Sequence, residues 1–387
     1  MITTHRGIET PRASVFVVSV TSVSRCVAFA LALALSSASL SAQGVDEALE
    51  AGFRALEQND GDRAATAFRR ALAAEPANPA ALYGAGAAAY LQGRHTDAMS
   101  FLKRSLAIEP RVIAASALLG EIAYHQGDLS FAIKTYESAL ALAPGHVELR
   151  QRLATWKSEA TVHDNLRAFK DDRFTILFDG PANRVLAERA TTVLRSAFWR
   201  IGEALRSYPT NAINVILYTD KQFHDITGAP EWAGAGFDGQ IRMPVAGATQ
   251  NLREFDRILT HELTHAMLAS IATRNVPAWL NEGLAMYFEG NNAAASEKRL
   301  AAARAFVPLA HLERGFTGLN AEQADLAYEM SAFATSALIA RIGASNLGFL
   351  LQDLDGGQTI DTAIQRFGLT FADFEAQLAK RVGVRLR

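Results

Sequence analysis

Cysteine is almost missing from this chain of 387 residues, which contains one, Cys26. Small disulfide-stapled domains need several cysteines, and many structural zinc sites use thiolates, so both kinds of protein are excluded. The chain is still long enough for two ordinary domains, and its 49% of hydrophobic residues can form a packed core without cross-links. Any metal site must therefore use histidine and carboxylate side chains.

An excess of charge of either sign is also lacking, because 38 Lys and Arg residues nearly balance 40 Asp and Glu residues. Nucleic-acid-binding domains are typically basic, so we expect no nucleic acid as a partner. The balance predicts an ordinary solvated surface of mixed charge.

A long hydrophobic run is lacking too, since the apolar segment near the start, Cys26 to Leu35, has only ten residues. A membrane-spanning helix needs about 20. The segment follows a positively charged start and precedes small residues that end at Ala42, which is the order of a secretory signal peptide. We predict a signal peptide over residues 1–42 and a periplasmic or secreted protein. An uncleaved leader that anchors the chain in a membrane is the alternative.

What the first half does contain is a 34-residue period. Three copies of one pattern at such a step are typical of stacked structural repeats. Small residues let two helices approach closely, a bulky residue fills the space between them, and proline ends the second helix. Asn59 stands for glycine in the first copy of a turn, because asparagine also tolerates the left-handed backbone. The recurring positions are Gly52, Gly86 and Gly120; Ala64, Ala98 and Ala132; Phe68, Leu102 and Tyr136; Gly93 and Gly127; and Pro76, Pro110 and Pro144.

This pattern resembles the tetratricopeptide repeat, with units at about 45–78, 79–112 and 113–146. Over residues 147–168 we predict the capping helix that the exposed end of such a stack needs. We therefore predict an all-α solenoid over residues 45–168. Its concave surface is expected to bind a peptide or protein partner, and a spacer that only positions the second domain is the alternative.

Two histidines four residues apart, His261 and His265, bracket Glu262 in the segment R-I-L-T-H-E-L-T-H-A-M-L. The apolar flanks and the lack of proline predict a helix, on which residues four apart share a face and can bind one metal ion. Glu262 lies beside that ion instead of binding it, so it can take a proton from a metal-bound water. Two histidines and a glutamate on a solvated helix face are the alternative.

The third ligand is expected on the next helix, because a catalytic zinc keeps three protein ligands and one open position. Glu282 lies seventeen residues after His265, within the apolar segment V-P-A-W-L-N-E-G-L-A-M-Y-F-E-G. A glutamate in a buried helix needs a cation. Zinc suits the chemistry, since it polarises a carbonyl and lowers the pKa of its bound water to about 7. We predict a Zn²⁺ site formed by His261, His265 and Glu282.

The segments 261–265 (H-E-L-T-H) and 277–285 (P-A-W-L-N-E-G-L-A) resemble those of gluzincin metallopeptidases, and among them the peptidase MA-like domains often found beside tetratricopeptide repeats. The resemblance covers about residues 172–380. It implies an α+β zincin-like domain over residues 172–387 and a peptide bond as the substrate. It also implies His261, His265 and Glu282 as the zinc ligands and Glu262 as the general base.

The resemblance further implies the elements around the site. Gluzincins place an edge strand along the cleft, where the substrate backbone pairs with it as an added strand. Gln240, Ile241, Arg242 and Met243 are therefore a candidate substrate ledge, and an ordinary sheet strand is the alternative. The expected elements are strands at 173–178 and 213–218, a helix at 184–206, and a hairpin or edge strand at 235–245.

Tyr328, in L-A-Y-E-M-S-A-F-A, is the candidate donor of a hydrogen bond to the oxyanion, because related enzymes use a tyrosine or histidine beyond the third ligand. Packing between helices is the alternative for Tyr328, and His311 is a second candidate. Some gluzincins also have an acidic residue soon after the ligand glutamate, which orients a ligand histidine. Here Ala285 and Met286 hold the next positions, so the residues that support the ligands stay unassigned.

The prediction is therefore an exported zinc metallopeptidase that hydrolyses peptide bonds and uses its repeats to bind a partner or substrate. The main alternative is a catalytically inactive zinc-binding scaffold that acts through its repeats. A zinc hydrolase of oligosaccharides or cell-wall material is a third reading.

Overall fold

The computed structural model describes residues 36–181, 183–228, 235–272, 274–316 and 318–384. The predicted signal peptide, residues 1–42, lies outside the described residues except for the backbone of its last seven, which belongs to α1 (Ser36–Glu57). The chain forms two compact units that divide between Thr161 and Val162. This division lies slightly before the predicted boundary at residues 168–172.

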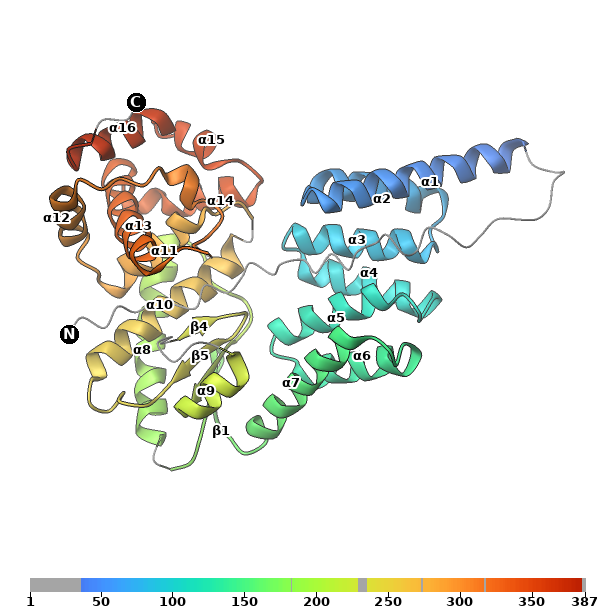
Figure 1. Ribbon diagram of the computed structural model, residues 1–387, viewed down its shortest axis with the longest axis horizontal. Helices are drawn as coiled ribbons and strands as arrows, with labels where there is room; N and C mark the ends of the chain where they lie inside the picture. The colour runs from blue at the N-terminus through green and yellow to red at the C-terminus, as the bar shows by residue number, and fades with distance from the viewer. Residues whose placement is uncertain (1–35, 182, 229–234, 273, 317, 385–387) are drawn as a thin grey trace. The chain divides into compact units, whose positions relative to one another are not determined.

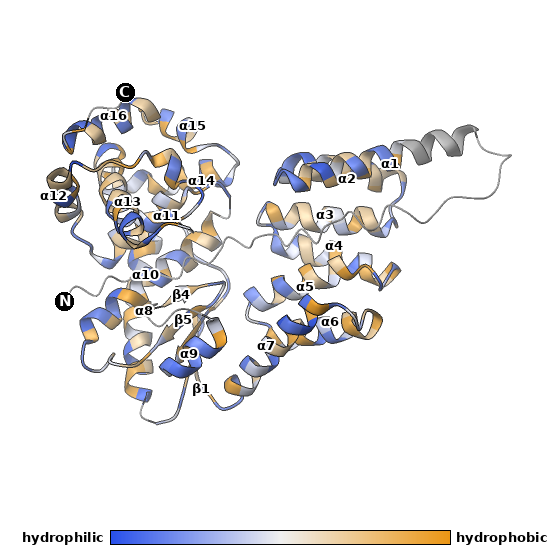
Figure 2. Ribbon diagram, in the orientation of Figure 1, coloured by the Kyte–Doolittle hydropathy of each residue, from blue (hydrophilic) through white to orange (hydrophobic). Residues whose placement is uncertain are grey.

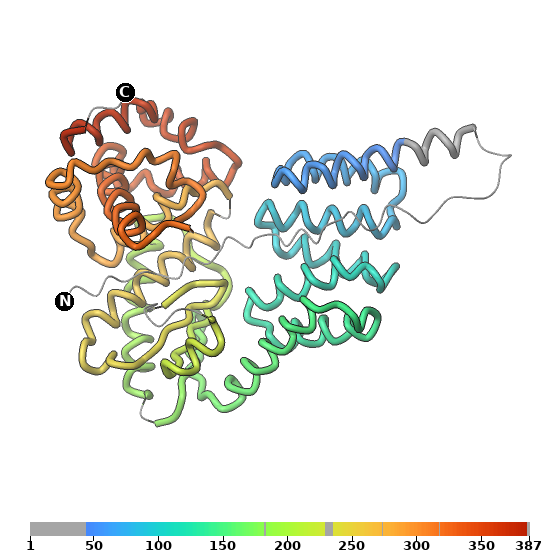
Figure 3. Tube along the Cα trace, in the orientation of Figure 1, coloured from blue at the N-terminus to red at the C-terminus, as the bar shows by residue number. Residues whose placement is uncertain are grey.

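The first unit consists of antiparallel helix pairs followed by one unpaired helix (Figures 1 and 3). The two helices of each pair pack on each other, and successive pairs stack. The predicted pattern of two helices per 34-residue unit is confirmed. The helices after α1 are α2 (Gly61–Ala74), α3 (Pro79–Leu91), α4 (His95–Ile108), α5 (Ile113–His125), α6 (Leu129–Leu142) and α7 (Val147–His163).

The turns of this unit follow from the recurring residues. Asn59, Gly93 and Gly127 all have left-handed backbone, with φ of 55°, 70° and 82°, as the substitution of Asn59 for glycine predicted. Helix α3 is hydrophobic almost all round (Figure 2), and 8 of its 13 residues are buried between its neighbours. Gly84 allows α3 to approach α2 closely because glycine has no Cβ. A Cβ at this position would lie only 2.2 Å from the ring of Phe68.

The last helix closes the stack through aromatic packing. Trp156 of α7 is fully buried. Its ring lies 5.0 Å from that of Tyr124 and 4.4 Å from that of Tyr136, measured between ring centroids. An aromatic cluster of this size contributes strongly to packing, so α7 covers the otherwise exposed end of the third repeat.

The second unit is built on a five-stranded sheet in the order β1-β2-β3-β5-β4. The inner strands β2 (Phe174–Phe178), β3 (Ile213–Tyr218) and β5 (Ile241–Pro244) run parallel. The edge strands β1 (Arg167–Lys170) and β4 (Gly236–Phe237) pair antiparallel with β2 and β5. The predicted strands and the hairpin at 235–245 are present.

Helices cover both faces of the sheet. On one face, α8 (Arg184–Leu205) and α10 (Leu252–Ile271) share the main core with inward side chains such as Val215 and Leu217. On the other face, Tyr218 packs with Phe223 of α9 (Asp220–Thr227). The helix expected at 184–206 is thus the one that backs the sheet (Figure 1).

Helices form the rest of this unit and lie on one side of it (Figure 1).

Among the described residues, no single helix is long and apolar enough to cross a membrane. Only the bent helix pair 321–342 and 344–355, taken together, has the length and composition of a membrane span. The predicted fold class, an all-α repeat unit followed by a mixed α and β domain, is confirmed. The elements are α11 (Ala278–Glu289), α12 (Ala293–Ala303), η2 (Leu309–Leu312), α13 (Ala321–Ile342), η3 (Ala344–Asn346), α14 (Leu347–Asp355), α15 (Ile360–Gln365) and α16 (Phe371–Arg381).

Candidate metal centre

Two adjacent helices, α10 and α11, carry the predicted metal ligands. Helix α10 begins after Asn251, whose side chain caps it by accepting a hydrogen bond from the Glu254 amide. It is buried continuously from Ile258 to Thr264, so its histidines face the interior of the unit. Helix α11 ends at Gly290, whose φ of 90° suits a left-handed cap.

Close packing on α13 fixes the position of α11. Gly283, next to Glu282 in the sequence, is the contact point, because a Cβ there would lie only 2.4 Å from the carbonyl oxygen of Ser331. No other residue type fits without moving a helix. The glycine of the N-E-G segment therefore lets α11, the helix that carries Glu282, pack closely on α13.

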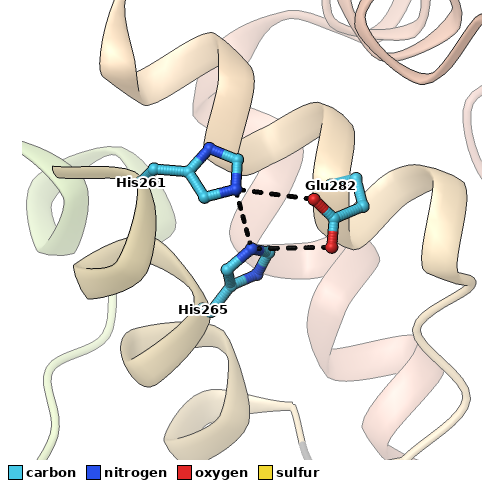
Figure 4. A group of neighbouring side chains, drawn as sticks. All are labelled: His261, His265 and Glu282. Atoms are coloured by element: carbon cyan, nitrogen blue, oxygen red, sulfur yellow. Dashed lines mark hydrogen bonds and ion pairs between the residues drawn. The ribbon is translucent and has the colours of Figure 1, made fainter. Parts of the chain in front are cut away.

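The structure brings His261, His265 and Glu282 together (Figure 4). The two Nε2 atoms lie 3.0 Å apart. The carboxylate of Glu282 faces both rings, with Oε2 3.5 Å from His261 Nε2 and Oε1 3.6 Å from His265 Nε2. Each residue thus offers a donor atom within 4.8 Å of the donor atoms of the other two, and each imidazole faces its nearer Glu282 oxygen.

This donor set fits a zinc ion. A tetrahedral zinc with bonds of about 2.0–2.1 Å separates two ligand atoms by about 3.3 Å, and the observed separations of 3.0, 3.5 and 3.6 Å bracket that value. The Oε2 atom of Glu282 is buried and has no hydrogen-bond partner among the described residues. A buried carboxylate oxygen needs such a partner, and a cation between the three residues would supply it.

The charges around the centre also favour a cation. Glu262 and Glu282 are 3% and 7% exposed, and the side chain of Glu289 is 2% exposed. Arg257 forms an ion pair with Glu289 and also pairs with the half-buried Glu254. Burial alone would lower the pKa of His261, but the neighbouring carboxylates of Glu282 and Glu289 raise it above its ordinary value. The same field that draws a proton to this imidazole draws a metal ion.

Two residues hold the histidines in place through their Nδ1 atoms, at the other side of each ring from Nε2. The Nδ1 atom of His261 lies 2.9 Å from Glu289 Oε2, and that of His265 lies 3.1 Å from Asn281 Oδ1. Both partner atoms are acceptors, which favours the tautomer with the proton on Nδ1 and leaves Nε2 free to bind a metal ion. The sequence reasoning missed both residues. Helical periodicity could have found Glu289, because it lies two turns after Glu282 on the same helix.

Glu262 is suited to act as a base. It follows His261 on the buried part of α10, and burial raises the pKa of its carboxyl above the ordinary value while the two imidazoles pull it down less. A carboxylate with a raised pKa accepts a proton from water more readily. Glu262 is thus a buried carboxyl with a raised pKa, directly after a candidate ligand in the sequence.

The predicted substrate ledge requires a correction. Residues 241–243 belong to β5, which is an inner strand with β3 on one side and β4 on the other. Gln240, Ile241, Arg242 and Met243 are all buried. Among the described residues, the edge strand beside β5 is the two-residue β4, so a peptide that adds to this side of the sheet has to pair with β4.

Arg242 has a structural role in this hairpin. Its Nε donates to Asp238 Oδ2 at 2.9 Å, and its Nη1 donates to the Tyr218 hydroxyl at 2.8 Å. That hydroxyl also lies 2.7 Å from Nε2 of His163. Arg242 shares the face of the sheet that carries Tyr218, opposite α10. It therefore ties the hairpin to β3 instead of contacting substrate.

The two oxyanion candidates lie in different surroundings. Tyr328 is half-buried in α13, and its ring meets that of Phe316 edge-on at 5.1 Å. His311 is exposed in η2. The contact with Phe316 is the packing that the alternative expected, and the role of Tyr328 toward an oxyanion stays a prediction.

The chain was compared with curated proteins and with solved structures. No curated protein matches the chain. Among solved structures, the first tetratricopeptide domain of Spaghetti (RPAP3) bound to the HSP90 peptide SRMEEVD is 22% identical to this chain. The match covers 31% of this chain and 97% of the Spaghetti chain, with a TM-score of 0.30. The first such domain of human RPAP3 is 21% identical, with coverages of 32% and 97% and a TM-score of 0.30. An O-GlcNAc transferase mutant from Thermobaculum terrenum is 16% identical, with coverages of 55% and 44% and a TM-score of 0.26.

Family comparison covers both units. Residues 49–113 and 109–147 match the tetratricopeptide repeat. Residues 195–381 match the Peptidase MA superfamily, and this segment includes both ligand-bearing helices. The chain is therefore a tetratricopeptide-repeat protein that carries a Peptidase MA superfamily domain at residues 195–381.

Proposed function

We propose that this protein is a zinc-dependent metallopeptidase of the gluzincin type. The observation that supports the proposal most is the convergence of His261, His265 and Glu282, with donor separations of 3.0 to 3.6 Å, beside the buried Glu262. The Peptidase MA superfamily match supports hydrolysis of a peptide bond.

The roles of the residues follow from their positions. Zinc bound by the three ligands would polarise the scissile carbonyl and lower the pKa of a bound water to about 7. Glu262 takes a proton from the attacking water and passes it to the nitrogen of the leaving amine. Asn281 and Glu289 hold the two imidazoles with their Nε2 atoms toward Glu282.

The test compares the wild-type chain with Glu262→Gln. Zinc content is measured by elemental analysis, and cleavage is measured by a proteomic screen with both proteins. We expect one zinc per chain in both, cleavage by the wild type and none by Glu262→Gln. Cleavage retained by the variant would refute the assignment of the base.

The same experiment separates the alternatives. If the protein is an inactive scaffold, the wild type and Glu262→Gln both bind zinc and neither cuts a peptide. A hydrolase of oligosaccharides or cell-wall material also cuts no peptide, and it releases reducing sugar ends in a Glu262-dependent way. Each of these results would replace the peptidase assignment while keeping the metal site.

We further propose that the repeats hold a peptide or protein segment, in line with their family match. Half-buried aromatic side chains of the first helices of the repeats support this, since Phe53 and Tyr83 stack at 6.1 Å and Tyr90 lies further along α3. A double variant Tyr83→Ser/Tyr90→Ser is expected to raise KM for protein substrates and leave kcat unchanged. An unchanged KM would assign the repeats to a spacer.

Export is part of the proposal and rests on the predicted leader at residues 1–42. Fractionation of cells that express the full chain is expected to place a shortened protein outside the cytoplasm. A full-length protein in the membrane fraction would indicate the uncleaved anchor.

A further inference from the structure

Arg257 lies one helical turn before His261 on α10 and contacts the residue that orients this histidine. Its Nη1 donates to Glu289 Oε2 at 2.6 Å. The same oxygen is the partner of His261 Nδ1 at 2.9 Å. One carboxylate oxygen thus joins the guanidinium to the imidazole that is expected to bind zinc.

The other edge of the guanidinium is held by Glu254. Arg257 Nε donates to Glu254 Oε2 at 2.9 Å, and Nη2 donates to Glu254 Oε1 at 2.8 Å. A bidentate pair of this kind fixes the plane of the guanidinium as well as its distance. The direction of the bond from Arg257 to Glu289 is therefore set by two contacts on the same helix.

Glu289 is placed where a carboxylate is unfavourable by itself. It is the last residue of α11, where the helix dipole has the same sign as its charge. Its side chain is 2% exposed, whereas those of Arg257 and Glu254 are 28% and 30% exposed. Burying an unpaired charge costs far more than burying a paired one, so Arg257 is what allows a carboxylate to stand behind His261.

We propose that Arg257 is a positioning residue for the metal centre: it holds Glu289 in the orientation that keeps the Nε2 atom of His261 turned toward His265 and Glu282. Arg257 touches none of the three ligand atoms, and it acts only through Glu289. The inference rests on the proposed zinc site and adds a residue that the ligand motif does not contain.

The effect is expected on metal affinity. Replacing the direct partner of a ligand histidine typically lowers metal affinity about 10–100-fold. Glu289→Gln should show a loss in this range. Arg257→Gln acts one contact further away, so we expect a loss of about tenfold. Arg257→Lys keeps a charge near Glu289 without the fork to Glu254, and its loss should be smaller.

The matched control is Arg189→Gln. Arg189 makes the same kind of bidentate pair, with Asp256 next to Arg257 on α10, at 2.7 and 2.6 Å. Its removal breaks one bidentate ion pair between α8 and α10 and leaves Glu289 untouched. A purely structural effect of Arg257 should therefore appear equally in Arg189→Gln.

The experiment uses the full chain, freed of metal with a chelator, and three measurements on each variant. Zinc affinity is obtained by competition with a chromophoric chelator, the visible absorption of the Co²⁺ form reports the ligand geometry, and thermal unfolding of the metal-free form reports folding. The expected result for Arg257→Gln is weaker zinc binding and an altered Co²⁺ spectrum, partly restored in Arg257→Lys. Arg189→Gln should keep the wild-type affinity and spectrum.

Two results would overturn the inference alone: wild-type affinity and spectrum in Arg257→Gln, or an equal loss in Arg257→Gln and Arg189→Gln. If the wild-type chain binds no zinc, the proposed function itself fails and the inference falls with it. The wild-type titration thus separates the two failures.

Discussion

Replacing Gly283 by alanine tests whether the packing of α11 on α13 holds the third ligand in place. The added Cβ would lie 2.4 Å from the Ser331 carbonyl oxygen and 2.0 Å from the Thr335 Oγ1 atom. The carbonyl belongs to the backbone of α13 and cannot rotate away. An ordinary contact between heavy atoms is about 3.5 Å, so the two helices must separate locally by about 1 Å.

The size of the effect follows from two opposing contributions. Overpacking of a close contact costs about 1–3 kcal/mol, and a clash with backbone belongs near about 3 kcal/mol. Alanine in a helix is better than glycine by about 1 kcal/mol. The net loss is about 2 kcal/mol, which lowers the unfolding midpoint of a domain of this size by roughly 4–8 °C. Because Glu282 precedes Gly283, zinc affinity should fall at least about tenfold, as when a supporting residue is lost.

Two measurements on the metal-free and zinc-loaded chain check this: thermal unfolding followed by circular dichroism, and zinc competition. Gly145→Ala is the control, because nothing lies within 4 Å of a Cβ at that position. Adding Thr335→Ala to the Gly283 variant should rescue it only in part, since the Ser331 carbonyl remains. A Gly283→Ala protein with wild-type midpoint and wild-type zinc affinity would refute the argument that this contact positions Glu282.

Two further predictions concern other parts of the second unit. Burial alone would raise the pKa of Asp171, but hydrogen bonds from the Arg173 amide, the Arg195 guanidinium and the Phe174 amide hold it below its ordinary value. Its stabilising effect is therefore present above about pH 4 and is lost as the pH falls through the lowered pKa. Asp171→Asn should therefore have a lower unfolding temperature than the wild type at pH 7 and the same unfolding temperature in strong acid. A difference in unfolding temperature that persists in acid would contradict this. Tyr328→Phe keeps the ring contact with Phe316 but removes the hydroxyl, and if that hydroxyl binds the oxyanion, kcat should fall about 100-fold or more with little change in KM. An unchanged kcat would assign Tyr328 to packing alone.

The repeat unit was predictable because its determinants lie in the chain at a fixed step. The turn at Asn59 and the ends of α2, α4 and α6 two residues before Pro76, Pro110 and Pro144 depend only on neighbouring residues. Each repeat contacts mainly its neighbours, so a local pattern is enough. The strands at 174–178 and 213–218 were predictable for a similar reason, since apolar β-branched and aromatic residues dominate them.

The position of β5 in the sheet was not predictable in this way. Its neighbour β4 consists of Gly236 and Phe237 only, which is too short to show any alternation of polar and apolar residues. Burial of Gln240 and Arg242 is also hidden from the sequence, because it depends on the partners Asp238 and Tyr218. The order of strands is decided by tertiary pairing, and an inner strand with polar residues reads like an edge strand.

The candidate metal centre was predictable from the sequence only in part, and the helical period explains which part. The convergence of the three candidate ligands was predictable because their residue types are specific and their spacing is short. The supporting residues obey the same geometry at longer range: Arg257, His261 and His265 follow one another at single turns of α10, and Glu289 lies two turns after Glu282 on α11. A search confined to the positions directly after Glu282 meets Ala285 and Met286 and stops one turn early. Acidic residues one or two turns from a candidate ligand, on a helix that is otherwise apolar, are therefore informative beside the ligand motif, because a buried carboxylate needs a cation or a hydrogen-bond donor close by.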